Sequence, residues 1–204
     1  MSAPHFRPPQ QARSRETLQK VLTSAEHVLA VGGIEDFTVA AVAERSGMSV
    51  GAIYRRFSGK EQLLEAVKDQ LLEQLETDVS QALRSAEPGL GSVIGAFTAA
   101  MAGAFSGHTR TFPALLSVQS VGGAERGLQA LDAVQRALVD AVEPHLAEVV
   151  RTEPRAAVRF SARTIIGSCV HRAASCDTWP DGLTWTDWAS RSAEMALADL
   201  TSRD

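Results

Sequence analysis

The chain has 204 residues, of which 45% are hydrophobic and 22% charged, and its formal net charge is −4. This composition is typical of a soluble globular protein of one large or two small domains, and it excludes a disordered or fibrous chain. Two cysteines, Cys169 and Cys176, are too few for a disulfide scaffold or a four-cysteine metal site. No apolar run approaches the roughly 18 uncharged residues that a membrane span needs, so we expect no membrane-spanning segment. The N-terminal residues lack the apolar core of a signal peptide, so we expect a cytoplasmic protein.

Charge is distributed unevenly along the chain. Residues 1–60 contain eight arginines and lysines against five acidic residues, whereas residues 61–204 contain twelve against nineteen. A basic first part on an acidic body indicates that the first part contacts a polyanion.

The first elements predicted in chain order are an arm and a helix. Residues 1–12 hold three prolines among polar neighbours and predict a flexible basic arm. From Arg13 onward, apolar residues recur at steps of three and four, which is the period of an α-helix. Gly32 and Gly33 end this helix, because glycine easily adopts the left-handed angles found at helix ends.

Two short helices follow, joined by a tight turn. Thr38 is placed to cap a helix over residues 39–45, and Ser49 is placed to cap a second helix that ends near Arg55. The turn between them, residues 46–48, contains glycine. Two short helices joined in this way predict a helix-turn-helix, whose second helix enters the major groove of DNA.

The rest of the chain predicts six further helices and no strand. A long helix runs from Lys60 to about Leu83, followed by a loop at residues 87–91. The next helix carries Val93, Phe97, Met101 and Phe105 on one face, and a short helix follows at 111–120. A third helix has an apolar stripe at 128–142 and is ended or kinked by Pro144. The last two helices run from Pro154 to about Ser175 and from Trp185 to Leu200. We therefore predict an all-α protein of about nine helices.

Residues 37–63 carry a more specific pattern than a bare helix pair. Its members are Phe37-Thr38, Val42-Ala43, Ser46-Gly47-Met48-Ser49, Gly51, Ile53-Tyr54, Phe57 and Lys60-Glu61-Gln62-Leu63. This pattern resembles the DNA-binding domain of TetR-family transcriptional repressors, and the match covers about residues 13–64. The resemblance implies an N-terminal three-helix helix-turn-helix domain at residues 13–60 and a C-terminal helical domain at residues 61–204 that binds an effector and dimerises.

The resemblance also implies roles for individual residues in double-stranded DNA binding. It places Thr38, Tyr54, Arg56 and Lys60 at phosphates, which fix position without reading sequence. It places five residues toward the bases, and among them only Arg55 is able to make a bidentate contact with guanine; the five are Ser49, Val50, Gly51, Ala52 and Arg55. The chain departs from the family at Arg56, where histidine is common.

These roles have structural alternatives. Tyr54 is also compatible with a half-buried core position, and Arg55 and Arg56 with a solvated charged pair. The arginines at positions 7, 13 and 15 either steer the arm onto DNA or only improve solubility.

Family members dimerise through their last two helices and bind a small-molecule effector in the C-terminal body. In this chain the resemblance points to a small, apolar face on those helices, made of Ala162, Ile165, Ile166, Cys169, Val170, Ala173, Ala189, Ala193, Ala196, Leu197 and Leu200. The alternative is that part of this face is the internal core of one subunit.

An effector pocket is expected among apolar residues of four helices, with polar residues to orient the ligand. The candidates are Phe97, Met101, Phe105, Phe112, Leu115, Leu116, Leu138 and Phe160, with Gln119, Thr164 and His171 as polar handles. The alternative is ordinary core packing, and for His171 a structural role.

Together these features predict a homodimeric repressor that leaves a palindromic operator when a small apolar or aromatic effector binds. We expect no cofactor, no metal, no membrane partner and no catalytic activity. The first alternative is a DNA-binding activator, or a regulator without a ligand, of the same fold. The second is an α-helical enzyme or adaptor in which the helix pair is incidental.

Overall fold

The computed structural model describes residues 10–112, 115, 121–175 and 179–203, and for residues 10–13 and 121–124 it describes only the backbone. All regular structure in these residues is helical, so the predicted all-α class is confirmed. Contacts divide the chain into two compact units, one ending at Lys68 and one starting at Asp69. The predicted division after residue 60 falls eight residues earlier, because the first turns of the long helix belong to the first unit.

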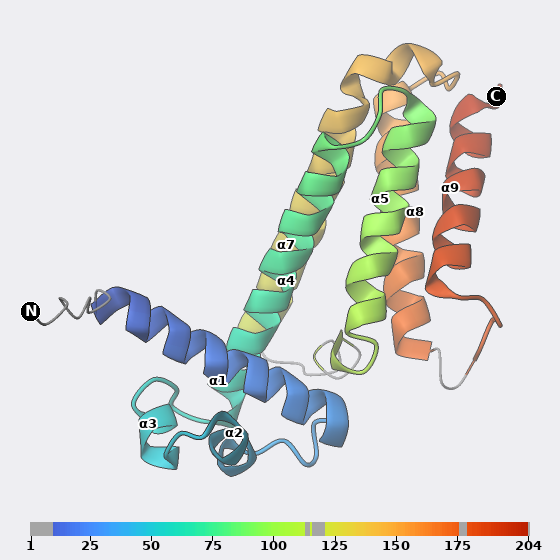
Figure 1. Ribbon diagram of the computed structural model, residues 1–204. Coiled ribbons are helices and arrows are strands. Elements are labelled where there is room, and N and C mark those ends of the chain that lie inside the picture. The colour runs from blue at the N-terminus through green and yellow to red at the C-terminus, as the bar shows by residue number, and fades with distance from the viewer. Residues whose placement is uncertain (1–9, 113–114, 116–120, 176–178, 204) are drawn as a thin grey trace, which may run out of the picture. The chain divides into compact units, whose positions relative to one another are not determined.

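The first unit contains α1 (Gln10–Gly32), α2 (Val39–Ser46), α3 (Val50–Tyr54) and the start of α4 (Lys60–Arg84). In Figure 1, α1 lies across α2 and α3. Helix α1 begins three residues before the predicted position, so the last three residues assigned to the arm are helical. Residues 1–9 of the expected arm lie outside the described residues.

The helix pair forms at the residues that the capping pattern predicts. The Thr38 Oγ1 accepts a hydrogen bond from the Ala41 amide at 3.1 Å, and the Ser49 Oγ accepts one from the Ala52 amide at 3.2 Å. Gly47 ends α2 with a φ of 64°, a left-handed angle that favours glycine. These caps fix both ends of the turn between α2 and α3.

The core of the first unit collects the apolar side of each helix. Seven apolar side chains in it have no exposed surface: Val21, Ala25, Leu29, Phe37, Val42, Ile53 and Leu63. Val42 and Ile53 are the inward-facing positions that the helix-turn-helix pattern requires. Burial of one face of α3 leaves its other face at the surface.

The second unit is a helical bundle. It contains the remainder of α4 together with α5 (Leu90–Gly107), α7 (Val121–Val142), the 3₁₀ helix η1 (Glu143–Glu148), α8 (Pro154–Ser175) and α9 (Trp185–Thr201). Helix α5 packs against α7, α8 and α9, and α7 packs against α8 (Figure 1). Pro144 lies in η1, where the α-helix ends, as expected. Of the helix predicted at 111–120, residues 111, 112 and 115 are helical and the others lie outside the described residues.

Helix α5 corrects the expectation that no segment is apolar enough to span a membrane. It has 18 residues with a mean hydropathy of 1.4 and no charged side chain, so length and composition alone would permit a span. In the structure its apolar side faces α7, α8 and α9, and Phe97 and Met101 are fully buried. Its N-terminus is capped by η1, because the Gly89 amide donates to His145 Nε2 and the Leu90 amide donates to Glu148 Oε2, both at 3.2 Å.

Candidate nucleic-acid interface

Helix α3 presents a mixed polar and apolar surface to solvent. Ser49, Gly51 and Arg55 are exposed, Val50 is 40% exposed, and Ala52 is half-buried. Among the described residues, the Arg55 side chain has no hydrogen bond or ion pair with another group. The five predicted base-facing residues therefore lie at or near the surface of one short helix, with a free guanidinium at its end.

Tyr54 and Thr38 are also at the surface. Tyr54 is 53% exposed, so its hydroxyl is not enclosed in the core. The Thr38 hydroxyl already accepts the Ala41 amide, but its own proton remains available to an external acceptor. Both placements suit hydrogen bonds to phosphate oxygens.

The other two predicted phosphate contacts are partly engaged inside the unit. The Arg56 Nη2 donates to the Ser14 hydroxyl at 2.8 Å and to the Ser14 carbonyl at 3.3 Å. The Lys60 Nζ donates to the Ile34 carbonyl at 2.7 Å, and its side chain is half-buried. Arg56 therefore joins α1 to the end of α3, Lys60 joins the loop after α1 to the start of α4, and each cation retains further N–H donors. Sequence reasoning missed both contacts, because their partners lie 42 and 26 residues away.

Six of the predicted effector-pocket residues lie in the interior of the second unit. Phe97, Met101 and Leu138 are fully buried, and Phe105, Phe112 and Leu115 are at most 4% exposed. The Phe105 and Phe112 rings stack with their centroids 4.4 Å apart. Leu116 and Gln119 lie outside the described residues.

Three further pocket candidates are at the surface, and the expectation that they complete an internal pocket is wrong. Phe160 is 68% exposed, Thr164 donates its hydroxyl to the Phe160 carbonyl, and His171 is exposed. Phe160 and Thr164 line a shallow hollow of about 220 Å³ between α8 and α9, whereas His171 lines another. Phe160, Thr164 and His171 lie on the exposed side of α8, because the helical period turns these positions away from the side that carries its buried residues.

The proposed dimer face also requires correction, because most of it is the core of one subunit. Val170 and Leu197 are half-buried, and the other nine residues are at most 9% exposed: Ala162, Ile165, Ile166, Cys169, Ala173, Ala189, Ala193, Ala196 and Leu200. Buried side chains are not available to a partner. The exposed apolar residues of these helices are instead Phe160 on α8 and Met195 on α9, which sequence reasoning did not assign to an interface.

The Gln70 Oε1 on α4 is buried and has no hydrogen-bond partner in the described part of the chain. Within that same part, no group of three or more histidine, cysteine or acidic side chains is placed to hold a metal ion.

Sequence comparison matches the N-terminal unit to known regulators. Residues 21–67 match the sequence model of the family described as "Bacterial regulatory proteins, tetR family". Over 67 residues, or 33% of this chain, the sequence is 34% identical to two proteins of Pseudomonas putida, the uncharacterized HTH-type transcriptional regulator TtgW and the HTH-type transcriptional regulator SrpR. The match spans half the length of TtgW and 32% of SrpR.

Structural comparison extends to the whole chain at low identity and therefore concerns the fold. The transcriptional regulator FadR from Bacillus subtilis, in complex with stearoyl-CoA, superposes with a TM-score of 0.73 at 13% identity, covering 89% of this chain and 98% of FadR. The TetR-family regulator PfmR from Thermus thermophilus gives 0.65 at 20% identity, covering 88% and 98%. Residues 21–67 therefore match the DNA-binding domain of the TetR family, and the chain as a whole shares the fold of a TetR-family regulator.

Proposed function

We propose that the protein is a cytoplasmic homodimeric repressor that binds a palindromic operator and releases it when a small apolar or aromatic effector binds. The observation that supports this most directly is the capped helix α3, whose exposed side carries Val50 and Arg55, whose side chain has no partner among the described residues. A helix of this kind fits the major groove, which is about 12 Å wide.

We assign recognition of the DNA base sequence to the side chains of α3. Arg55 makes a bidentate contact with guanine, and Val50 contacts a thymine methyl group. Thr38, Tyr54, Arg56 and Lys60 hold the phosphates, with Arg56 and Lys60 also keeping α1 in place through the bonds described above.

Dimerisation is assigned to the outer faces of α8 and α9. Phe160 and Met195 are 68% and 71% exposed, and they flank the hollow between the two helices. A face that carries both projecting apolar side chains and a hollow suits a two-fold interface, in which the same surface meets its own copy. One recognition helix reads only a few base pairs, whereas two multiply the discrimination.

Effector release is assigned to the second unit and to α4. The buried residues Phe97, Met101, Phe105 and Leu138 supply the apolar surroundings, and the Gln70 oxygen, which has no partner among the described residues, supplies an acceptor for a ligand donor. Helix α4 is continuous from Lys60 to Arg84, so it begins in the DNA-binding unit and ends in the second. Release requires an effector that prefers the state unable to bind DNA, and DNA must then weaken effector binding by the same factor.

A mobility-shift titration with DNA from upstream of the protein's own gene tests this proposal. We expect a shifted complex that contains two chains and whose affinity falls steeply as salt rises, because phosphate contacts release counterions. Absence of a specific complex at micromolar protein contradicts the proposal. Transcription in a reconstituted system then separates a repressor from an activator of the same fold.

A further inference from the structure

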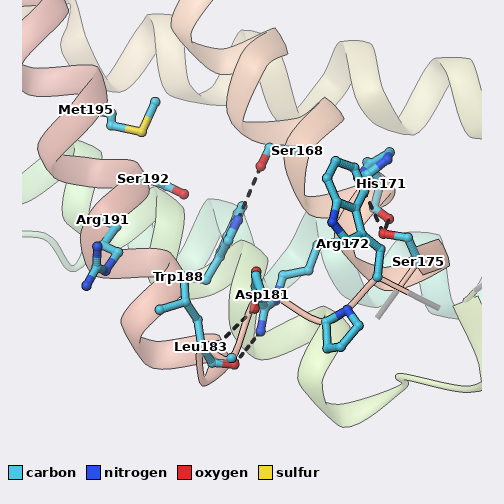
Figure 2. Close-up of a pocket in the computed structure, with 13 residues that line it drawn as sticks. Ser168, His171, Arg172, Ser175, Asp181, Leu183, Trp188, Arg191, Ser192 and Met195 are labelled. Atoms are coloured by element: carbon cyan, nitrogen blue, oxygen red, sulfur yellow. Dashed lines mark hydrogen bonds and ion pairs between the residues drawn. The ribbon is translucent and has the colours of Figure 1, made fainter. Parts of the chain in front are cut away.

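Residues 179–183 and parts of α8 and α9 line a second hollow, which shares Ser168, Ser192 and Met195 with the hollow of the proposed dimer face and contains none of the buried residues proposed for the effector. It has a volume of about 640 Å³, which lies in the range of small-molecule sites. Figure 2 shows Ser168 and His171 on the α8 side and Ser192 and Met195 on the α9 side. Trp179 and Trp188 also line it, so it combines aromatic walls with hydroxyl groups.

The walls of this hollow are held in place by specific contacts. Arg172, whose side chain is 12% exposed, forms an ion pair with Asp181, donates to the Leu183 carbonyl at 2.6 Å and lies 4.8 Å from the centre of the Trp185 ring. These bonds hold Asp181 and Leu183 against the end of α8. This part of the wall is therefore built before any ligand arrives.

The aromatic walls offer stacking surface. Trp179 is 73% exposed, and its ring meets the His171 ring in an edge-to-face contact with the centroids 5.8 Å apart. The Trp188 indole is held by its N–H, which donates to the Ser168 hydroxyl at 3.2 Å (Figure 2). An exposed indole fixed by its neighbours stacks well on a planar ring.

The polar groups around the hollow favour an anion. Among the described residues that line it, the one carboxylate, Asp181, is paired with Arg172, and the Arg191 guanidinium at the α9 rim adds a positive charge that also attracts Asp187 one turn earlier on α9. The Ser168 hydroxyl accepts from Trp188 and keeps its own proton for an external acceptor. Ser192, whose side chain is half-buried and makes no hydrogen bond within the described residues, adds a second hydroxyl.

From these features we propose that the hollow binds a planar aromatic carboxylate. The ring lies against Trp179, and the carboxylate accepts hydrogen bonds from Ser168 and Ser192 and is attracted by Arg191. The residues of this proposed site are not among those proposed to contact DNA, so ligand binding here can be tested without DNA.

Ligand-observed fluorine NMR on the full chain tests the proposal, with para-trifluoromethylbenzoate and the equally sized para-trifluoromethylbenzylammonium as probes. At neutral pH we expect the benzoate to bind and the ammonium to bind at least tenfold more weakly, as a rough figure. Trp179→Ala is expected to weaken benzoate binding about tenfold and Arg191→Gln about fivefold. Both residues are exposed, so the fold should persist, which circular dichroism checks.

Arg163→Gln is the matched control, because Arg163 is an exposed arginine of α8 that lines a different hollow, next to α7. It should leave benzoate binding unchanged. Equal binding of the ammonium, or unchanged benzoate binding in both Trp179→Ala and Arg191→Gln, overturns the proposal. If the same two variants instead shift only the dimer dissociation constant, a second copy of the chain fills the hollow and the proposal is also wrong.

Discussion

Replacing Arg55 by alanine isolates the reading of DNA sequence from the stability of the fold. Among the described residues the Arg55 side chain makes no hydrogen bond or ion pair, and it is exposed at the end of α3. Its removal should therefore change the free energy of unfolding by no more than about 0.5 kcal/mol. Any large effect on DNA binding then reports the contact itself.

The size of the effect follows from the assigned contact. A bidentate arginine–guanine pair contributes about 1–3 kcal/mol of discrimination in each half-site, so a dimer loses about 2–6 kcal/mol. Fluorescence anisotropy with the operator and with duplexes changed at each base pair measures this loss. Preference should relax at one position per half-site, whereas the other positions keep theirs.

Two other arginines serve as comparisons. Arg56→Ala removes a phosphate donor and the bonds to Ser14, so it should weaken binding to all sequences alike and lower the free energy of unfolding by about 1 kcal/mol. Arg84→Ala removes the same charge at the far end of α4 and should change neither the affinity for DNA nor the free energy of unfolding. If Arg55→Ala lowers affinity uniformly and leaves base preference intact, Arg55 is a phosphate contact and the assignment is refuted.

Three further outcomes are expected. Met195→Asp should shift sedimentation equilibrium toward the monomer, because it places a charge in the proposed interface; an unchanged dimer would exclude this face. Hydrogen bonds from Thr184 lower the pKa of the Asp187 carboxyl from its ordinary value of 3.8. Asp187 therefore stabilises the folded protein at pH values above the ordinary pKa, and this stabilisation is lost as the pH falls through the lower pKa of the folded state. Asp187→Asn should therefore flatten acid unfolding followed by circular dichroism, and an unchanged acid profile would contradict this. Burial raises the pKa of the Cys169 thiol, so iodoacetamide should not label it in the native protein, as peptide mass mapping will show; rapid labelling would mean that the interior opens.

Much of the first unit could be predicted from the sequence, because local signals determine it. Thr38 and Ser49 are good capping residues, and Gly47 satisfies a left-handed angle, so the boundaries of α2 and α3 follow from a few neighbouring positions. The exposed side of α3 follows from the burial of Ile53. The bond from Arg56 to Ser14 could not be predicted, since it depends on how α1 crosses the pair.

The second unit shows where periodicity stops being informative. The helical period correctly identifies the apolar face of α8 and α9, but it does not say whether that face meets another helix of the same chain or a partner. Ala162 and Ala193 face the interior, whereas the exposed residues Phe160 and Met195 lie on the outer side. Small residues suit both situations, so only the packing of α5 against α8 and α9 decides between them.

Hydroxyl-radical footprinting of the protein on DNA upstream of its own gene tests whether two copies of α3 read a palindromic operator. We expect two protected segments related by a two-fold axis, with their centres about one helical turn or a modest multiple of it apart. The protection should weaken in parallel with specific binding when Arg55 is replaced. A single protected segment without symmetry, or uniform protection along the fragment, would show that two copies of α3 do not read such an operator.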